Sequence, residues 1–418
     1  MLTDRGRFAL ALGGLVYLVG WAFGSDPLYP TAIALVLAVI GAFTWVKLVG
    51  RPVKLRRTMK GEHIAGEDVP VTVELELEGK VKAHSLVLVE HIERLGDREV
   101  ELERRGDRLR GKYVIKRVPR GRYPIEAAEV VVEDPLGLER SVVSLNEPDA
   151  VLVYPRLVEL ERLFSETGSR LQEGRRLLLR RPSGFDFHGV REYEQGESLR
   201  RVHWPTTAKR GQLMVKDLED SPRDEVLVLL DADAGFVTGE APDSSFELAV
   251  SAAGSILRAH VGRGRRAGLL VNGRLPRYQS VHTLDGDWDL ALEALAAVEA
   301  DGHNPVAALL VEGAGLPSKA LELCIVTSGV SPRLADRLLQ RSVTRRGSSV
   351  VYVEPTSFAE GSEERPLPAD VRAQLARLDH AGIPVCVLRR GDDLAAHLGP
   401  GFVAAFGNGA PAAEVALG

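Results

Sequence analysis

Hydrophobic and polar residues follow three different patterns along the chain, and each pattern predicts a different kind of structure. Residues 8–24 and 28–47 form two almost uninterrupted apolar runs. A helix needs about 20 apolar residues to cross the hydrocarbon of a bilayer, at a rise of about 1.5 Å per residue. Only Ser25, Asp26 and Pro27 separate the runs, so residues 1–52 are expected to form two transmembrane helices joined as a hairpin.

The basic residues around the hairpin predict its orientation. Arg5 and Arg7 precede the first run, whereas the turn holds only Asp26. More basic residues follow the second run: Lys47, Arg51, Lys54, Arg56, Arg57 and Lys60. Because Lys and Arg are retained on the cytoplasmic side, we expect a multi-pass cell-membrane protein whose N-terminus and soluble domains are cytoplasmic. A cleaved signal peptide is the alternative for the first run, but no small-residue cleavage pattern follows it.

Residues 53–154 change to a regular alternation of apolar and polar positions. The alternation is clearest where polar residues separate Val69, Val71, Val73 and Leu75. A period of two is typical of strands that bury one face. Several such segments, separated by turns that contain Gly or Pro, predict an antiparallel β-sandwich.

Residues 221–398 alternate continuous apolar strands with amphipathic helices. The predicted strands are 226–231, 267–271, 321–327, 349–353 and 385–388, and the predicted helices are 246–261, 288–299, 332–343 and 370–380. This alternation is typical of an α/β domain whose parallel sheet is covered on both faces. Residues 155–220 form a connecting segment of weak periodicity, and the Ala- and Gly-rich residues 399–418 are expected to be a flexible tail.

Composition narrows the classes of function. The net charge of −5 argues against a surface built to bind nucleic acid, so no nucleic-acid partner is expected. Cys324 and Cys386 both lie in apolar strand-like runs, which fits buried thiols in a reducing compartment. The Gly-rich run 262–268 follows a helix and precedes a strand, the reverse of the order that binds phosphate.

Two carboxylates follow the first strand of the α/β domain, where ligand sites of such sheets lie. The strand order resembles the von Willebrand factor A fold, in which an Asp-x-Ser-x-Ser motif at this point helps to hold a divalent ion. This chain keeps the first position with Asp231, has Asp233 at the first Ser and Gly235 at the second. The resemblance thus implies a degenerate Mg²⁺ site at Asp231 and Asp233, and no other cofactor is expected. The alternative is that Asp231 accepts backbone N–H bonds and caps a loop or helix.

A second group of motifs reads Arg-Gly-Arg-Tyr at 120–123, Asp-Pro-Leu-Gly-Leu at 134–138, and a longer signature within 184–211. The signature contains Arg191-Glu192-Tyr193, Gly196-Glu197, Arg200-Arg201-Val202-His203-Trp204 and Ala208-Lys209-Arg210. Together these motifs resemble domain-of-unknown-function family 58, whose members read Arg-Glu-Tyr, Gly-Asp, Arg-x-Ile-x-Trp and Ala-Arg in this order. The chain departs from that pattern at Glu197, Val202 and Lys209. The resemblance covers essentially the whole chain, from the two membrane helices to the von Willebrand A-like domain.

The signature allows two interpretations of its residues. Its charged and aromatic members are Arg191, Tyr193, Glu197, Arg200, Arg201 and Trp204, with Gly196 between them. The Arg and Glu side chains can form bidentate pairs beneath the aromatic rings, a network that fixes an irregular segment. Alternatively these residues form a docking surface, because Trp, Tyr and Arg dominate binding hot spots. His188 and His203 match no metal-binding spacing and are expected to be hydrogen-bonded scaffolding.

We therefore expect a membrane-anchored scaffold or adaptor that binds protein partners and is not an enzyme. The family resemblance implies a MoxR-type ATPase as one partner, in the assembly or maturation of complexes with other membrane or cytoplasmic proteins. A protein-binding domain that depends on a divalent metal at Asp231 and Asp233 is the alternative. A hydrolase ranks third, because no nucleophile, base and orienting residue can be identified together.

Overall fold

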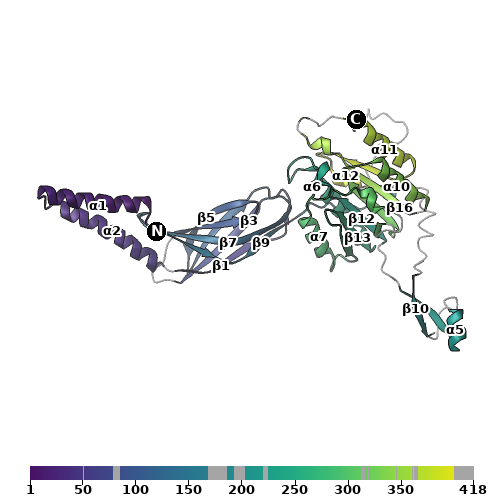
Figure 1. Cartoon of the computed structure of the whole chain (residues 1–418), viewed down its shortest axis with the longest axis horizontal. Coiled ribbons are helices and arrows are strands. Elements are labelled where there is room, and N and C mark those ends of the chain that lie inside the picture. Colours follow the sequence, from purple (N-terminus) through teal and green to yellow (C-terminus); the bar gives the residue numbers. More distant parts are fainter. Residues whose placement is uncertain are drawn as a thin grey trace, which may run out of the picture. The chain divides into compact units, whose positions relative to one another are not determined.

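The structure is a computed structural model of the chain. It describes residues 1–49, 51–78, 85–167, 186–192, 203–219, 225–311, 316, 317, 320–344, 346–359, 361 and 366–399. The predicted flexible tail therefore lies outside the described residues, apart from Gly399. The chain divides into two compact units, Met1–Tyr154 and Pro155–Gly418 (Figure 1).

Two apolar helices open the first unit, as the sequence predicts. Helix α1 spans Asp4–Phe23 and α2 spans Leu28–Leu48, and both are long and apolar enough to cross a membrane. The Thr3 side chain caps α1 by accepting the N–H of Gly6, and Gly24 ends the helix at a positive φ of 65°. Small residues let the helices approach closely: a Cβ added at Gly13 would lie 3.3 Å from the Leu35 side chain.

The remainder of the first unit is a nine-stranded sheet. Its strands are β1 Arg51–Met59, β2 His63–Ile64, β3 Val69–Glu78, β4 Ser85–Ile92, β5 Gly96–Arg105, β6 Arg108–Ile115, β7 Gly121–Glu133, β8 Arg140–Leu145 and β9 Asp149–Tyr154. They follow the order β1-β3-β6-β5-β4-β7-β9-β2, and β8 also pairs with β7. All of these pairs are antiparallel except β2 with β9.

This sheet corrects the predicted sandwich, because hydrogen bonds join all nine strands into a single curled sheet: eight lie along one path, and β8 is attached to it through β7. The path turns at β5 and β6, which pair only through the last three residues of β5, from Glu103 to Arg105. The two halves then close over one core that contains Leu75, Leu88 and Leu102. Period-two alternation predicts buried faces but cannot distinguish two sheets from one sheet that folds back on itself.

A buried ion pair crosses the interior of the curled sheet. Arg57 Nε of β1 donates to Glu90 Oε1 of β4 at 2.5 Å, and the two side chains are 2% and 0% exposed. The Tyr113 hydroxyl of β6 donates to the other carboxylate oxygen of Glu90. Arg57 Nη1 donates to the Glu147 carbonyl at 2.6 Å. Three strands that are distant in sequence are thus joined by one polar network inside an apolar core.

The second unit contains a six-stranded sheet in the part of the chain that the structure describes. Its strands are β12 Val226–Asp231, β13 Ala267–Asn272, β14 Arg277–Val281, β15 Glu322–Thr327, β16 Gly347–Val353 and β17 Val385–Leu388, in the order β14-β13-β12-β15-β16-β17. Five strands are parallel, and β14 is antiparallel to β13. The sheet is therefore mixed rather than purely parallel, because the short connection from Asn272 to Arg277 can only join antiparallel neighbours.

Helices cover both faces of this sheet. The longer ones are α6 Ser245–Gly262, α7 Trp288–Ala297, α10 Pro332–Val343 and α11 Ala369–His380, and the short ones are α3 Phe164–Thr167, α8 Val306–Leu309, α12 Leu394–Leu398 and the 3₁₀ turns η2 Ala234–Phe236 and η3 Pro355–Phe358. Alternate residues of β12 enter different cores: Val228 packs with residues of α6 and α7, and Leu229 with residues of α10 and α11. Both faces of β12 are therefore buried, which explains its uninterrupted apolar sequence.

Candidate functional site

Polar side chains meet where the sheet of the second unit changes winding direction. From β12 the chain continues to β13 on one side, whereas β15, β16 and β17 follow on the other. The carboxyl ends of β12, β13 and β15 carry Asp231, Asn272 and Thr327. In open α/β sheets, ligands bind outside the carboxyl ends of strands at this kind of switch point.

Each oxygen of the Asp231 carboxylate accepts a hydrogen bond from a neighbouring strand. Asn272 Nδ2 donates to Oδ1 at 3.1 Å, and Thr327 Oγ1 donates to Oδ2 at 2.7 Å. The same Asn272 amide donates to the Asn304 carbonyl at 2.8 Å, and Thr327 Oγ1 accepts the N–H of Gly329 at 3.0 Å. Asp231 thus links three parallel strands. It also has a backbone hydrogen bond from Asp233, which fits the loop cap that the sequence offers as an alternative.

Burial raises the pKa of Asp231 above its usual value. Hydrogen bonds from Thr327 and Asn272 act in the opposite direction, because they stabilise the carboxylate, and the nearby charge of Asp233 raises the pKa further. A carboxyl group of raised pKa in a strand-end cluster is a common mark of a functional site, although structural networks produce the same shift.

Asp233 has a separate local role. Its Oδ1 accepts the N–H of Gly235 at 2.9 Å and caps η2, and its backbone forms a parallel bridge with Gly302. Within the described residues, no group of three or more His, Cys, Asp or Glu side chains could hold a metal ion. Among the described residues no third His, Cys, Asp or Glu joins Asp231 and Asp233, so the present arrangement does not supply the several oxygen ligands that Mg²⁺ binds in near-octahedral geometry. The metal site stays a prediction.

An exposed aromatic side chain that the sequence patterns did not predict lies beside this cluster. Phe236 is 44% exposed, and its ring lies over Gly329, where an added Cβ would come within 2.5 Å of the ring. The next residue, Val237, is also exposed. The signal in the sequence is the apolar pair Phe236-Val237 in a loop directly after the acidic strand end. The carboxyl edge therefore combines a polar network with an exposed apolar patch.

A cavity of about 450 Å³ opens at the neighbouring strands β13 and β14. Its wall includes Val271 and Arg277 from the strands, Ala297 from the end of α7, and Asp301 from the following loop. Asp301 Oδ1 accepts the N–H of Arg274 at 3.0 Å, which holds the β13–β14 connection against that loop. The volume lies within the range of small-molecule and cofactor pockets, roughly 300–1,000 Å³.

The family signature lies partly within the described residues. Strand β10 Asp186–Glu192, which includes Arg191, pairs antiparallel with β11 Met214–Glu219, and helix α5 Trp204–Arg210 lies between them in the chain. Trp204 is 64% exposed. His203 bonds Thr206, with Nδ1 and Oγ1 2.8 Å apart. The other signature residues, Tyr193, Gly196, Glu197, Arg200 and Arg201, lie outside the described residues.

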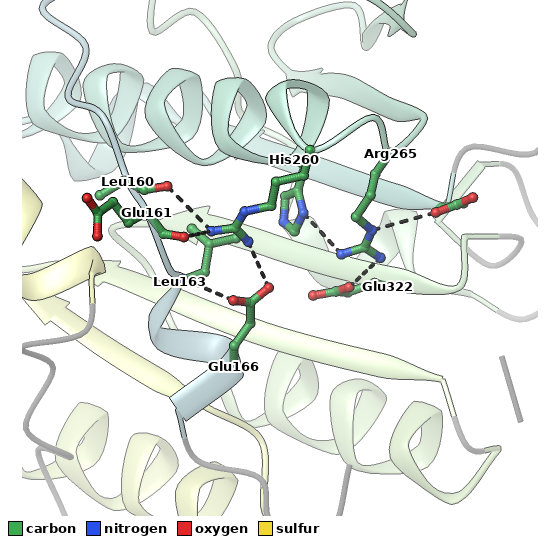
Figure 2. Close-up of polar contacts among 9 residues, drawn as sticks. Leu160, Glu161, Leu163, Glu166, His260, Arg265 and Glu322 are labelled. Carbon is green, nitrogen blue, oxygen red and sulfur yellow. Dashed lines mark hydrogen bonds and ion pairs between the residues drawn. The ribbon is translucent and has the colours of Figure 1, made fainter. Parts of the chain in front are cut away.

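At the opposite, amino-terminal edge of the sheet, two arginines hold several elements together (Figure 2). Arg263 pairs with Glu166 at 2.8 Å and donates to the Glu161 carbonyl at 2.6 Å, which fixes the segment before α3 to the end of α6. Arg265 pairs with Glu322 at 2.7 Å and lies 3.1 Å from Nδ1 of His260. Burial, followed by the two arginine charges, lowers the pKa of His260 to about 3, so this histidine stays neutral. These contacts are structural and lie away from the candidate site.

Comparison with known proteins agrees with the signature. A family model described as protein of unknown function DUF58 matches residues 189–301. The uncharacterized protein YeaD of Bacillus subtilis (strain 168) is 26% identical over 275 residues, which cover 63% of this chain and 65% of that protein, just under two thirds of its length. A solved structure, the CARDB domain of the PF1109 protein from Pyrococcus furiosus in complex with di-metal ions, is 21% identical, covers 24% of this chain and 88% of that chain, and has a TM-score of 0.17. A structural likeness at that TM-score carries no argument. The chain is similar to DUF58 proteins over residues 189–301.

Proposed function

We propose that this protein is a membrane-anchored adaptor whose second unit binds protein partners at the carboxyl edge of its sheet. The observation that carries the proposal is the exposed Phe236 beside the hydrogen-bonded Asp231, Asn272 and Thr327. Aromatic side chains on a rigid polar support are typical hot spots of protein interfaces. The Asp231 carboxylate, the Asn272 NH₂ group and the Thr327 hydroxyl each bond another group of the chain, which preorganises this edge for docking, and Asn272 Oδ1 is buried without a hydrogen-bond partner.

The second unit is, in this proposal, a von Willebrand A-like domain. Support comes from the position of Asp231 at the end of β12, where the Asp-x-Ser-x-Ser motif of that fold begins, and from the mixed sheet with an antiparallel edge strand. The cavity lined by Arg277 and Asp301 lies at the carboxyl end of β13 and the start of β14. A partner segment bound at Phe236 can therefore also occupy this cavity at the same edge of the sheet.

The hairpin anchors the adaptor with both soluble parts in the cytoplasm. Support comes from the asymmetry of its basic residues, with Arg5 and Arg7 before α1 and Lys47 at the end of α2, whereas Asp26 is the charged residue of the turn. The partner proposed is a MoxR-type ATPase, which the family resemblance implies, acting in the assembly or maturation of complexes. The DUF58 match over residues 189–301 supports the family part of this inference, because it begins within β10 and includes β12 and β13.

Affinity capture from detergent-solubilised membranes tests the adaptor role. The full-length chain should recover a MoxR-type ATPase, and Phe236→Asp should reduce that recovery more than about tenfold, as expected for a hot-spot side chain. Val343→Asp is the matched control, because Val343 is also apolar and highly exposed but ends α10 at the opposite side of the sheet. Repeated capture without such an ATPase would refute the partner, and equal recovery with both variants would refute the docking surface.

A further inference from the structure

The loop between β7 and β8 is bonded to the residues directly before α1, although the two segments are about 130 residues apart in the chain. The N–H of Thr3 donates to the Leu138 carbonyl at 3.0 Å. The Thr3 hydroxyl donates to the Gly137 carbonyl at 2.6 Å, and Leu2 forms an antiparallel bridge with Glu139. The loop therefore lies beside the start of the first apolar helix.

A buried carboxylate makes this loop rigid. Asp134, at its first position, accepts the N–H groups of Leu136 at 2.8 Å, Leu138 at 2.7 Å and Glu139 at 2.6 Å. Gly137 has a positive φ of 65°, which permits the tight turn between these donors. The Asp-Pro-Leu-Gly-Leu motif thus folds around its own aspartate and holds Leu136 in a fixed position.

The junction between loop and helix leaves no space for a larger residue at Gly6. A Cβ at this position would lie 2.2 Å from the Leu138 carbonyl oxygen, whereas a Cβ at Gly14, on the same helix, would meet nothing within 4 Å. Real Cβ atoms essentially never approach a backbone atom so closely. Gly6 therefore keeps α1 in direct contact with the loop.

The other end of the hairpin is also fixed to the curled sheet. Val49 is fully buried in the core of the sheet, and Trp45 and Val46 of the last turn of α2 pack against the same core. Strand pairing places both attachment points at the same end of the sheet. Arg51, at the start of β1, pairs with Glu78, and Glu133, at the end of β7, pairs with Arg140 at the start of β8. One end of the sheet thus holds both the start of α1 and the end of α2.

The lengths of the helices place this end at the surface of the bilayer. A 20-residue helix is about 30 Å long, which equals the thickness of the hydrocarbon. If α1 crosses it, Thr3 and the loop bonded to it lie at the boundary between lipid and water. At this level Leu136 is 62% exposed, Pro135 is also exposed, and the exposed basic residues Arg5 and Arg140 flank them.

We propose that the β7–β8 loop is a second membrane contact, in which Leu136 enters the interfacial region of a phospholipid bilayer. The exposed Pro135-Leu136 tip supplies apolar surface to the acyl boundary, and Arg5 and Arg140 are placed to meet lipid phosphate groups. The contact rests on the proposed membrane anchoring by α1 and α2. Its consequence is a curled sheet held upright on the membrane at several points, instead of a domain that swings on one linker.

Site-directed spin labelling of the full-length chain in nanodiscs of phosphatidylcholine and phosphatidylglycerol tests this contact. The native Cys324 and Cys386 are buried, so a label reacts with an introduced cysteine. Labels are placed at Leu136→Cys, at Leu37→Cys in the middle of α2, and at Val114→Cys on the exposed face of β6. Relative accessibility to oxygen and to a water-soluble nickel complex reports the depth of each label. We expect a deep label at 37, an interfacial one at 136 and a water-exposed one at 114.

The outcomes separate the loop contact from the anchor. A label at 136 that matches the label at 114, while the label at 37 is deep, overturns the loop contact and leaves the anchor intact. A water-exposed label at 37 overturns the anchor itself. In the protein labelled at 136, Gly6→Ala should shift the label toward water and Gly14→Ala should not. An unchanged depth with Gly6→Ala would contradict the proposed junction with α1.

Discussion

Replacing Glu90 with alanine should lower the free energy of unfolding of the curled sheet by about 3–5 kcal/mol. The reason is that Glu90 is the buried counter-charge of Arg57, whose side chain is only 2% exposed. Without the carboxylate, the guanidinium would remain buried with the Glu147 carbonyl as its acceptor, and the Tyr113 hydroxyl would lose its acceptor. Urea unfolding of the full-length chain in detergent, followed by hydrogen exchange of peptides from β1, β4 and β6, measures the loss.

A matched control lies in the same sheet. Arg108 and Glu76 form an ion pair at 2.7 Å, but both side chains are about two-fifths exposed, so Glu76→Ala should cost at most about 1 kcal/mol. The double replacement Arg57→Met with Glu90→Leu should recover most of the stability lost in Glu90→Ala, because no charge is left buried. A Glu90→Ala cost no larger than that of Glu76→Ala would show that the buried pair is not as the structure describes it.

Two replacements of Asp231 should have opposite consequences. Asp231→Ala removes the acceptor of Asn272 and Thr327 and should cost about 1–3 kcal/mol of folding stability. Asp231→Asn keeps the network, because the new amide oxygen accepts from Asn272 and the new NH₂ donates to Thr327 Oγ1. The Thr327 hydroxyl then donates to the Gly329 carbonyl, 3.0 Å away. Thermal unfolding of the second unit, followed in the full-length chain, distinguishes the two variants.

The pH dependence of the Asn variant follows from the raised pKa of Asp231. A carboxyl whose pKa is higher in the folded chain than in the unfolded chain, where it is about 3.9, destabilises the fold when it ionises. This cost is absent below the unfolded pKa, grows as the pH rises between the two values, and is complete above the folded pKa. The stability of Asp231→Asn relative to the natural chain should therefore increase across that window, and a constant or falling difference would contradict the burial described.

The same variants decide the magnesium alternative. If Asp231 and Asp233 hold a divalent ion, calorimetric titration with Mg²⁺ should give heat with the natural chain and none with Asp231→Asn. The hydrogen-bonded arrangement predicts no binding heat with either protein. Heat that disappears in the variant would reinstate the metal-dependent binding domain as the better account.

Local patterns predict the elements of this protein well wherever burial has a simple period. The apolar runs predict both helices of the hairpin, and the continuous apolar stretch at Val226 predicts β12. Strand β14 was missed, because Arg277 to Val281 is an edge strand of mixed polarity. The single curled sheet was not predicted, because its continuity depends on the short pairing between β5 and β6, which local alternation does not encode.

The candidate site was predictable in part. Asp231 and Asp233 follow from the rule that ligands bind at the carboxyl ends of strands. Asn272, which donates to Asp231, was not predicted as part of the site. It ends β13, and only the fold shows that β13 lies next to β12. Phe236 resembles an ordinary loop residue until Gly329 is seen to lie under its ring. The contact between Thr3 and the β7–β8 loop joins residues too far apart in sequence for any local pattern to predict.

Reporters fused after Gly418 test whether the hairpin holds the adaptor on the cytoplasmic side of a membrane. We expect a green fluorescent protein fusion to fluoresce in the membrane fraction and an alkaline phosphatase fusion to be inactive. Because the two reporters are active on opposite sides of the membrane, the pair gives a result for either orientation. An active phosphatase with a dark fluorescent fusion would contradict both the orientation and the cytoplasmic adaptor.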